Sequence, residues 1–240
     1  MIKLALVPIF LLCFLLVYTA YTFYEAPFTK HFCNLYHKES KNEYANLIRI
    51  LNDRDYCPSS KNDIFDKYIH WNNETIAAIK GNILVFKGSD TMKDLFYDFT
   101  TSPNALHKGR TISNIQLIYS NIKHEIKSII SLHRINIITG WSLGSVLSCI
   151  TAFDNAENID KIVCFGFPNI FDVDFKERYN RVLGNKTIIH NHNLDIFANM
   201  IGYGKILDQV DTTRWINVPI SNIYKLLTNG LAFYHMSYFN

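Results

Sequence analysis

Residues 135–153 read INIITGWSLGSVLSCITAF: a β-branched run, a serine between glycines, and an apolar stretch. The run from Ile135 to Thr139 predicts a buried strand, and the stretch from Leu143 to Phe153 predicts a helix. Between them, Gly140-Trp141-Ser142-Leu143-Gly144 has the form G-x-S-x-G. A serine in so tight a strand-to-helix turn has a strained backbone, and its hydroxyl projects clear of the sheet. We therefore predict that Ser142 is a nucleophile; the alternative is an ordinary glycine-rich helix start.

Strands and helices are expected to alternate along the rest of the chain. Short β-branched runs predict strands, and apolar residues at helical spacing predict helices. A helical or irregular segment at 25–66 is followed by predicted strands at 75–79, 82–86, 161–165 and 187–190, and by predicted helices at 115–133 and 174–183. This alternation predicts an α/β fold with a mainly parallel central sheet and helices on both faces.

The composition is that of a folded protein. Hydrophobic residues make up 48% and charged residues 19% of 240 residues, a length that one domain with a single core can fill. The net charge of +3 comes without the dense basic stripe that phosphate binding requires, so a nucleic-acid partner is not expected. No Cys/His spacing resembles a zinc site, and no sequence period indicates a repeat protein.

The first 24 residues differ from the rest of the chain. Lys3 precedes an unbroken apolar run from Leu4 to Tyr18, and residues 20–24 extend it. This pattern is typical of a secretory signal or of an uncleaved anchor, since a bilayer core needs about 17 to 25 apolar residues. A buried N-terminal helix is the remaining alternative. We expect residues 1–24 to be a signal peptide or anchor, and residues 25–240 to form one domain in a lumen or outside the cell.

The cysteines are consistent with that location. Cys33 and Cys57 flank a charged stretch near the N-terminus and are candidates for a disulfide in an oxidising compartment. The sequence alone does not fix this pairing. Cys149 and Cys164 lie in apolar segments, so they are predicted to be buried thiols.

A serine nucleophile needs a histidine that takes its proton and a carboxylate that orients the histidine. When the nucleophile lies in a G-x-S-x-G turn, the chain order is Ser, then Asp or Glu, then His. Asp195 follows a predicted strand, and His235 lies near the C-terminus, so these two are the candidates. The alternatives left open are Asp172, Asp174, Asp208 and Asp211 for the acid, and His190 and His192 for the base.

From about Thr75 onwards, the chain resembles the class 3 lipases, the fungal-type triacylglycerol lipase family of α/β-hydrolases. Five segments in the family's order carry the resemblance: Val85-Phe86-Lys87-Gly88-Ser89, Lys93-Asp94-Leu95-Phe96-Tyr97-Asp98-Phe99, Phe165-Gly166-Phe167-Pro168-Asn169, Asn193-Leu194-Asp195-Ile196-Phe197 and His235-Met236-Ser237-Tyr238-Phe239. The resemblance implies an α/β-hydrolase fold, with Asp195 and His235 as the acid and base of a triad. It also implies an oxyanion hole formed by Ser89 and the backbone N–H of Leu143, and it implies no cofactor or metal.

Several residues depart from the family's pattern. Trp141 stands where the family commonly has His, and Gly144-Ser145 stands where it has Gly-Gly. Ile196-Phe197 replaces a Val-Pro pair after the acid. The segment between Asp195 and His235 is short, so we expect the loops over the acyl groove to be trimmed. None of these changes removes a catalytic group, but together they leave the size of the substrate open.

The activity that the resemblance implies is hydrolysis of lipid carboxylic esters at a membrane or emulsion surface. Apolar residues at 92–99 would give a lid an apolar face for such a surface, although the same spacing also suits core residues. Two other classes stay open. One is a phospholipase A1 or short-chain carboxylesterase with the same triad, and the other is a catalytically silent lipid-binding protein.

Overall fold

The computed structural model describes residues 40–54, 63–89, 113–168, 170–171, 173–192 and 213–216, together with 195, 198 and 238. Its strands are β1 Lys67–Trp71, β2 Glu74–Lys80, β3 Ile83–Phe86, β4 Ile137–Trp141, β5 Lys161–Phe165, β6 Thr187–His192 and β7 Thr213–Ile216. Its helices are α3 Glu43–Asp53, α5 Ser113–His133, α6 Leu143–Asp154 and α7 Val173–Leu183, with a short 3-10 helix, η2 Gly184–Lys186.

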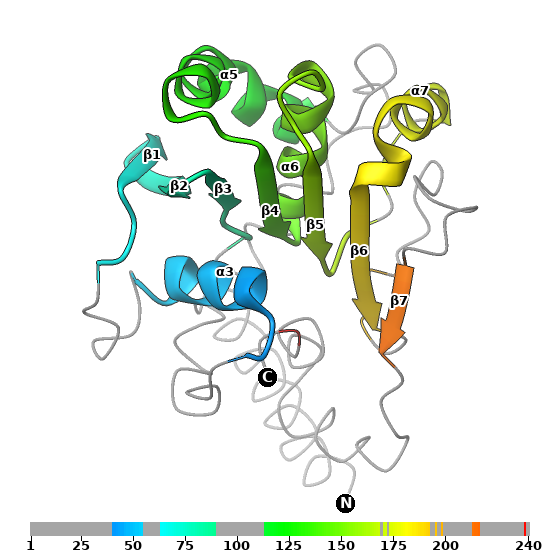
Figure 1. Ribbon diagram of the computed structural model, residues 1–240, viewed down its shortest axis with the longest axis horizontal. Coiled ribbons are helices and arrows are strands. Elements are labelled where there is room, and N and C mark those ends of the chain that lie inside the picture. Colours follow the sequence, from blue (N-terminus) through cyan, green and yellow to red (C-terminus); the bar gives the residue numbers. More distant parts are fainter. Residues whose placement is uncertain are drawn as a thin grey trace, which may run out of the picture.

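The described strands form a seven-stranded sheet whose order in space follows their order in the chain. The first three strands pair antiparallel, and β3 to β7 are parallel throughout. The parallel strands therefore all end at one edge of the sheet, and the arrowheads of β4 to β7 show this edge in Figure 1. In open α/β sheets, ligands bind at that edge. The predicted α/β architecture, with a mainly parallel central sheet, is confirmed.

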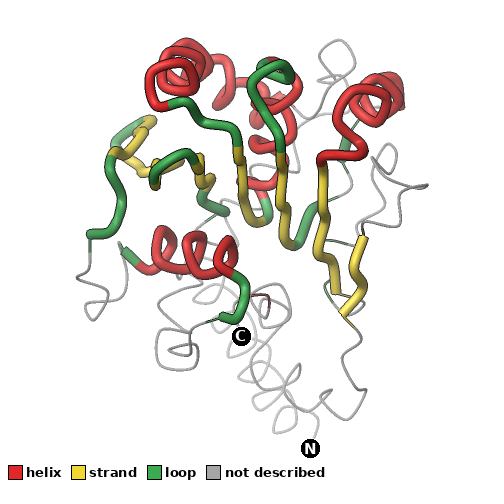
Figure 2. Tube along the Cα trace, in the orientation of Figure 1, coloured by secondary structure: helices red, strands yellow, loops and turns green. Residues whose placement is uncertain are grey.

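Side chains from alternate strand positions form two hydrophobic clusters, one on each face of the sheet. Leu84 and Ile138 face α5, α6 and α7, whereas Val85 and Val163 face α3. Figure 2 shows α3 on the opposite side of the sheet from the other three helices. The prediction of helices on both faces is thus confirmed, and α3 packs beneath β3 and β4, the strands that lead to the candidate site.

The elements expected from the sequence are present with small shifts at their ends. The strand expected from Ile135 begins at Ile137, and the helix expected from Asp174 begins at Val173. Strands β1 and β7 were not expected. The predicted leader, the Cys33–Cys57 pair and the candidate lid lie outside the described residues. None of the helices that the structure describes is both long and apolar enough to cross a membrane.

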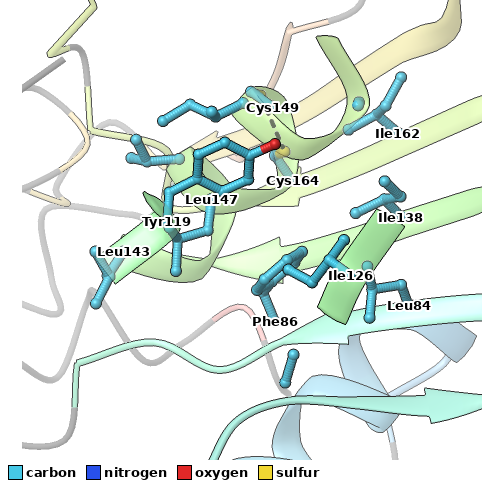
Figure 3. Close-up of a cluster of buried hydrophobic side chains, with 14 of the residues drawn as sticks. Leu84, Phe86, Tyr119, Ile126, Ile138, Leu143, Leu147, Cys149, Ile162 and Cys164 are labelled. Carbon is cyan, nitrogen blue, oxygen red and sulfur yellow. Dashed lines mark hydrogen bonds between the residues drawn. The ribbon is translucent and has the colours of Figure 1, made fainter. Parts of the chain in front are cut away.

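Cys149 on α6 and Cys164 on β5 face one another inside the larger cluster, with 3.8 Å between their sulfur atoms (Figure 3). Both are free and fully buried, which confirms the prediction of buried thiols. Burial raises the pKa of the Cys164 thiol well above its ordinary 9.0, and the neighbouring Cys149 raises it further. The folded protein therefore holds Cys164 as the neutral thiol.

This burial predicts a loss of stability in alkali. The pKa of Cys164 is higher in the folded than in the unfolded protein. Its contribution to the free energy of unfolding is therefore complete below the pKa of the unfolded thiol, and it is lost as the pH rises above that value. One such group costs up to about 1.4 kcal/mol for each pH unit above that point. Urea unfolding from pH 7 to pH 10.5 should therefore show a free energy of unfolding that falls more steeply for the wild type than for Cys164→Ala. Tyr179, whose pKa burial also raises, titrates in both proteins. Parallel curves for the two proteins would show that folding does not raise the pKa of Cys164.

Candidate active site

Ser142 lies alone between the last residue of β4 and the first residue of α6. Its backbone has φ 55° and ψ −121°, a left-handed conformation that a residue with a side chain rarely adopts. The neighbouring strand helps to hold it there, because the Ser142 N–H donates to the carbonyl of Phe165 over 3.0 Å. At the other end, the Ser142 carbonyl accepts the backbone N–H and the hydroxyl of Ser145. The strand, turn and helix predicted around this serine are confirmed.

The two glycines of the pentapeptide are required by close backbone contacts. A Cβ placed on Gly140 would lie 2.2 Å from the carbonyl oxygen of Gly144. A Cβ placed on Gly144 would lie 2.4 Å from the carbonyl oxygen of Lys87 and 2.6 Å from that of Phe86. Without these side chains, α6 can start directly against the ends of β3 and β4. This approach brings the helix N-terminus, where backbone N–H groups face outward, beside the loop that follows β3.

The close approach at Gly144 makes Gly144→Ala a severely destabilising change. The three nearest atoms that the new methyl would meet are all backbone, so relief requires α6 or the end of β3 to move. Overpacking typically costs about 1 to 3 kcal/mol, and we expect this variant to reach or exceed the upper value. Urea unfolding of the purified variant measures the loss.

Gly81→Ala provides the matched control. Gly81 has φ 59° but no neighbouring atom within 4 Å of its Cβ position. Alanine there therefore adds only the strain of a left-handed backbone, about 1 to 2 kcal/mol. If Gly144→Ala were no more destabilising than Gly81→Ala, the contact between α6 and the β3 end would be looser than these distances indicate.

The loop formed by Lys87, Gly88 and Ser89 follows β3 and lies beside the pentapeptide. A Cβ on Gly88 would lie 2.3 Å from the Trp141 ring, so the ring packs directly on this glycine. Ser89 and Leu143 are both buried, at 5% and 6% exposure. The two predicted oxyanion donors therefore belong to segments in direct contact, since Gly144, next to Leu143, meets the carbonyl of Lys87. The oxyanion role itself stays a prediction.

Asp195 is completely buried, which is unusual for a carboxylate unless partners satisfy it. Its Oδ2 accepts the hydroxyl of Tyr238 over 2.8 Å, and its Oδ1 accepts the backbone N–H of Ala198 over 3.1 Å. The Tyr238 ring also packs edge-on against Phe165, with 6.3 Å between ring centroids. Because the Phe165 carbonyl holds the Ser142 N–H, a continuous set of contacts connects the candidate acid to the candidate nucleophile.

The other acids and bases proposed from the sequence lie in different surroundings. Asp174 is exposed in the first turn of α7, unlike the buried Asp195. His190 on β6 is half-buried and lies flat against Phe165, with 4.8 Å between ring centroids. His235, Asp172, Asp208 and Asp211 are outside the described residues, and the side chain of His192 is not described. The assignment of His235 as the base thus stays a prediction.

Three polar residues around the site were not singled out from the sequence. Tyr238 holds Asp195, as described above. Asn191 joins the ends of β5 and β6, since its side chain accepts the N–H of Phe167 over 2.9 Å and donates to the carbonyl of Phe167 over 3.3 Å. Asn52, on α3, accepts the N–H of Gly88 over 3.3 Å. Only Tyr238 lay in a segment with a recognisable pattern, and nothing local distinguished either asparagine.

Comparisons with known proteins give a family match and similar folds. The family described as Lipase (class 3) matches residues 83–203, which run from β3 through Asp195. Lipase II from Rhizopus niveus has a similar structure, with a TM-score of 0.52, 14% sequence identity, and 81% of each chain covered. The native Rhizomucor miehei lipase propeptide complex gives a TM-score of 0.49 at 16% identity; the match covers 65% of this chain and 61% of that one. No curated protein matches. The family match spans half of the sequence, and the chain therefore belongs to the class 3 lipase family.

Proposed function

We propose that this protein is a serine hydrolase that cleaves carboxylic esters of lipids, with Ser142 as the nucleophile. The observation that carries the proposal is the left-handed Ser142 at the strand-to-helix turn, which two close-packed glycines hold beside the loop containing Ser89. Membership of the class 3 lipase family supports the reaction type. Asp195 is buried and accepts the hydroxyl of Tyr238, whose ring packs on Phe165, and the Phe165 carbonyl accepts the Ser142 N–H. These contacts support Asp195 as the triad acid.

The proposed reaction proceeds through an acyl-enzyme. His235 takes the hydroxyl proton of Ser142 as the serine oxygen attacks the ester carbonyl, and Asp195 orients the histidine ring. The N–H of Leu143, together with the N–H and hydroxyl of Ser89, stabilises the negative oxygen of the intermediate. The ester C–O bond then breaks, and the alcohol leaves with the proton from His235. Water attacks the acyl-enzyme with the same base, releases the fatty acid and restores Ser142, so no cofactor is needed.

The proposed substrate is a lipid ester at a membrane or emulsion surface, and the family supports this choice. A phospholipase A1 or a short-chain carboxylesterase would use the same groups and differ only in the acyl and head-group sites. The apolar segment at 1–24 supports secretion or membrane anchoring, with the catalytic domain in a lumen or outside the cell. A catalytically silent lipid-binding protein is the alternative from a different class.

A substrate panel and a covalent probe together test the proposal. The full-length protein is assayed on a triglyceride emulsion, a phospholipid and short p-nitrophenyl esters, and it is also treated with a fluorophosphonate. We expect hydrolysis of at least one lipid ester, and we expect mass spectrometry to map the label to Ser142. The preferred substrate separates lipase, phospholipase and esterase. A folded protein that neither hydrolyses these esters nor reacts with the probe would favour the silent lipid-binding alternative.

A further inference from the structure

Asn52 is a buried polar residue on α3, outside the segment that matches the family. Only 1% of its surface is exposed, although asparagine is usually found at protein surfaces. Its amide nitrogen donates to the carbonyl of Ile48 over 2.8 Å, and its Oδ1 accepts the N–H of Gly88 over 3.3 Å. A buried amide is stable only when it is hydrogen-bonded, and these two bonds fix the orientation of the side chain.

The bond to Gly88 is the second of two consecutive hydrogen bonds that hold the loop containing the proposed oxyanion donor. The N–H of Lys87 is held by the carbonyl of Ile76 on β2 over 2.9 Å, and the next N–H, that of Gly88, is held by Asn52. The next N–H along the chain is that of Ser89, the proposed oxyanion donor. The Trp141 ring also packs on Gly88. Because glycine has no side chain to limit its backbone, an external hydrogen bond there removes considerable conformational freedom.

A purely local role for Asn52 would need only the bond to Ile48. Asn155 illustrates that simpler case, since it is also buried, at 4% exposure, and donates to the carbonyl of Thr151 over 2.8 Å at the end of α6. Both asparagines therefore make the same bond to the carbonyl four residues earlier. Of the two, only Asn52 has a described bond to the loop beside Ser142.

We propose that Asn52 is a positioning residue that holds the Gly88–Ser89 loop in the geometry required to stabilise the oxyanion. This inference rests on the proposed serine hydrolase function and adds α3 to the structural elements that shape its site. Asn52 does not contact the substrate; it acts through the peptide of Gly88. A preorganised donor contributes to catalysis because it does not need to reorganise during the reaction, so a loop free to shift would lower kcat.

Asn52→Leu, Asn52→Asp and the matched control Asn155→Leu test the proposal in the full-length protein. Leucine has a similar size but no hydrogen-bonding atom, so each Leu variant loses one bond to the carbonyl four residues earlier, and only Asn52→Leu also loses the bond to Gly88. We expect kcat on a p-nitrophenyl ester to fall about 10- to 100-fold in Asn52→Leu, with KM changed less than about threefold. Asn155→Leu should stay within about twofold. Asn52→Asp keeps an acceptor for Gly88 and should recover at least about threefold over Asn52→Leu.

Amide hydrogen exchange at Gly88 provides a readout that is independent of activity. We expect exchange at this amide to accelerate about tenfold or more in Asn52→Leu and to stay unchanged in Asn155→Leu. Equal kcat values and equal Gly88 exchange in the two Leu variants would overturn the proposal. If the wild-type protein hydrolyses no ester, the proposed function fails, and the exchange at Gly88 still decides whether Asn52 holds the loop.

Discussion

Replacing Ser142 by glycine is expected to abolish ester hydrolysis while stabilising the fold relative to the alanine variant. The loss of activity follows from the loss of the nucleophile; removing the serine of a triad lowers kcat about a million-fold. The gain in stability follows from the backbone at φ 55° and ψ −121°, which glycine adopts without strain. Such strain costs about 1 to 3 kcal/mol. Kinetics on an ester that the wild type hydrolyses, together with urea unfolding, measure both effects.

Ser142→Ala is the control for this prediction. Alanine removes the same hydroxyl but retains the strained conformation, so its kcat should fall as far as that of Ser142→Gly. Glycine also makes the unfolded chain more flexible, which offsets about 0.5 to 1 kcal/mol of the strain relief. We therefore expect Ser142→Gly to be about 1 kcal/mol more stable than Ser142→Ala. Activity within 100-fold of the wild type in Ser142→Ala would exclude Ser142 as the nucleophile. Equal stability of the two variants would show that the turn stores no strain.

Residues 135–153 could be interpreted from sequence because the information needed there is local. A β-branched run, a tight turn with two glycines and an apolar stretch each favour one conformation, and the three agree. The same holds for β3 and β5, where short apolar runs predicted the strands to within one residue. Such segments are buried on both faces of a parallel sheet, and their sequence is accordingly almost continuously apolar.

The strands that were not predicted lack that local pattern. In β1, Ile69 is the one residue that is buried, because the strand lies at the edge of the sheet, and the register shifts between Ile69 and His70. Periodicity is weak where burial is one-sided and interrupted. The strand is defined instead by pairing with β2, which begins three residues later. Strand β7 is as short as β3, but its first two residues are Thr213 and Arg214, so it forms no apolar run.

The polar contacts of the candidate site depend on residues far apart in the sequence. Asn52 and Gly88 are separated by 36 positions, and Tyr238 and Asp195 by 43. An asparagine in an amphipathic helix looks like any other polar residue until the fold shows what it faces. Asp195 was selected among several acids by chain order and by the family resemblance, and the structure adds its burial and its two hydrogen-bond donors.

Asp195→Asn is expected to lower kcat about 10,000-fold while the protein remains folded. The Asp195 carboxylate accepts hydrogen bonds at both oxygens, from Tyr238 and from the N–H of Ala198. An asparagine can accept at only one position, so its NH₂ group must face one of these two donors or turn away. The neutral amide also cannot stabilise the positively charged histidine that forms when the proton leaves Ser142. Steady-state kinetics on the preferred ester and circular dichroism of the variant measure the two parts of this expectation.

Tyr238→Phe tests how much the hydrogen bond from Tyr238 contributes, apart from the charge of Asp195 itself. Phenylalanine retains the ring against Phe165 and removes only the hydroxyl that donates to Oδ2 of Asp195. One hydrogen bond to a charged group contributes about 1.5 to 3 kcal/mol, of which only a part acts on the transition state, so we expect kcat to fall about 10-fold. A large loss in Asp195→Asn with a small loss in Tyr238→Phe would assign the essential charge to Asp195. If Asp195→Asn instead kept activity within 100-fold of the wild type, the acid would have to be sought among Asp172, Asp208 and Asp211.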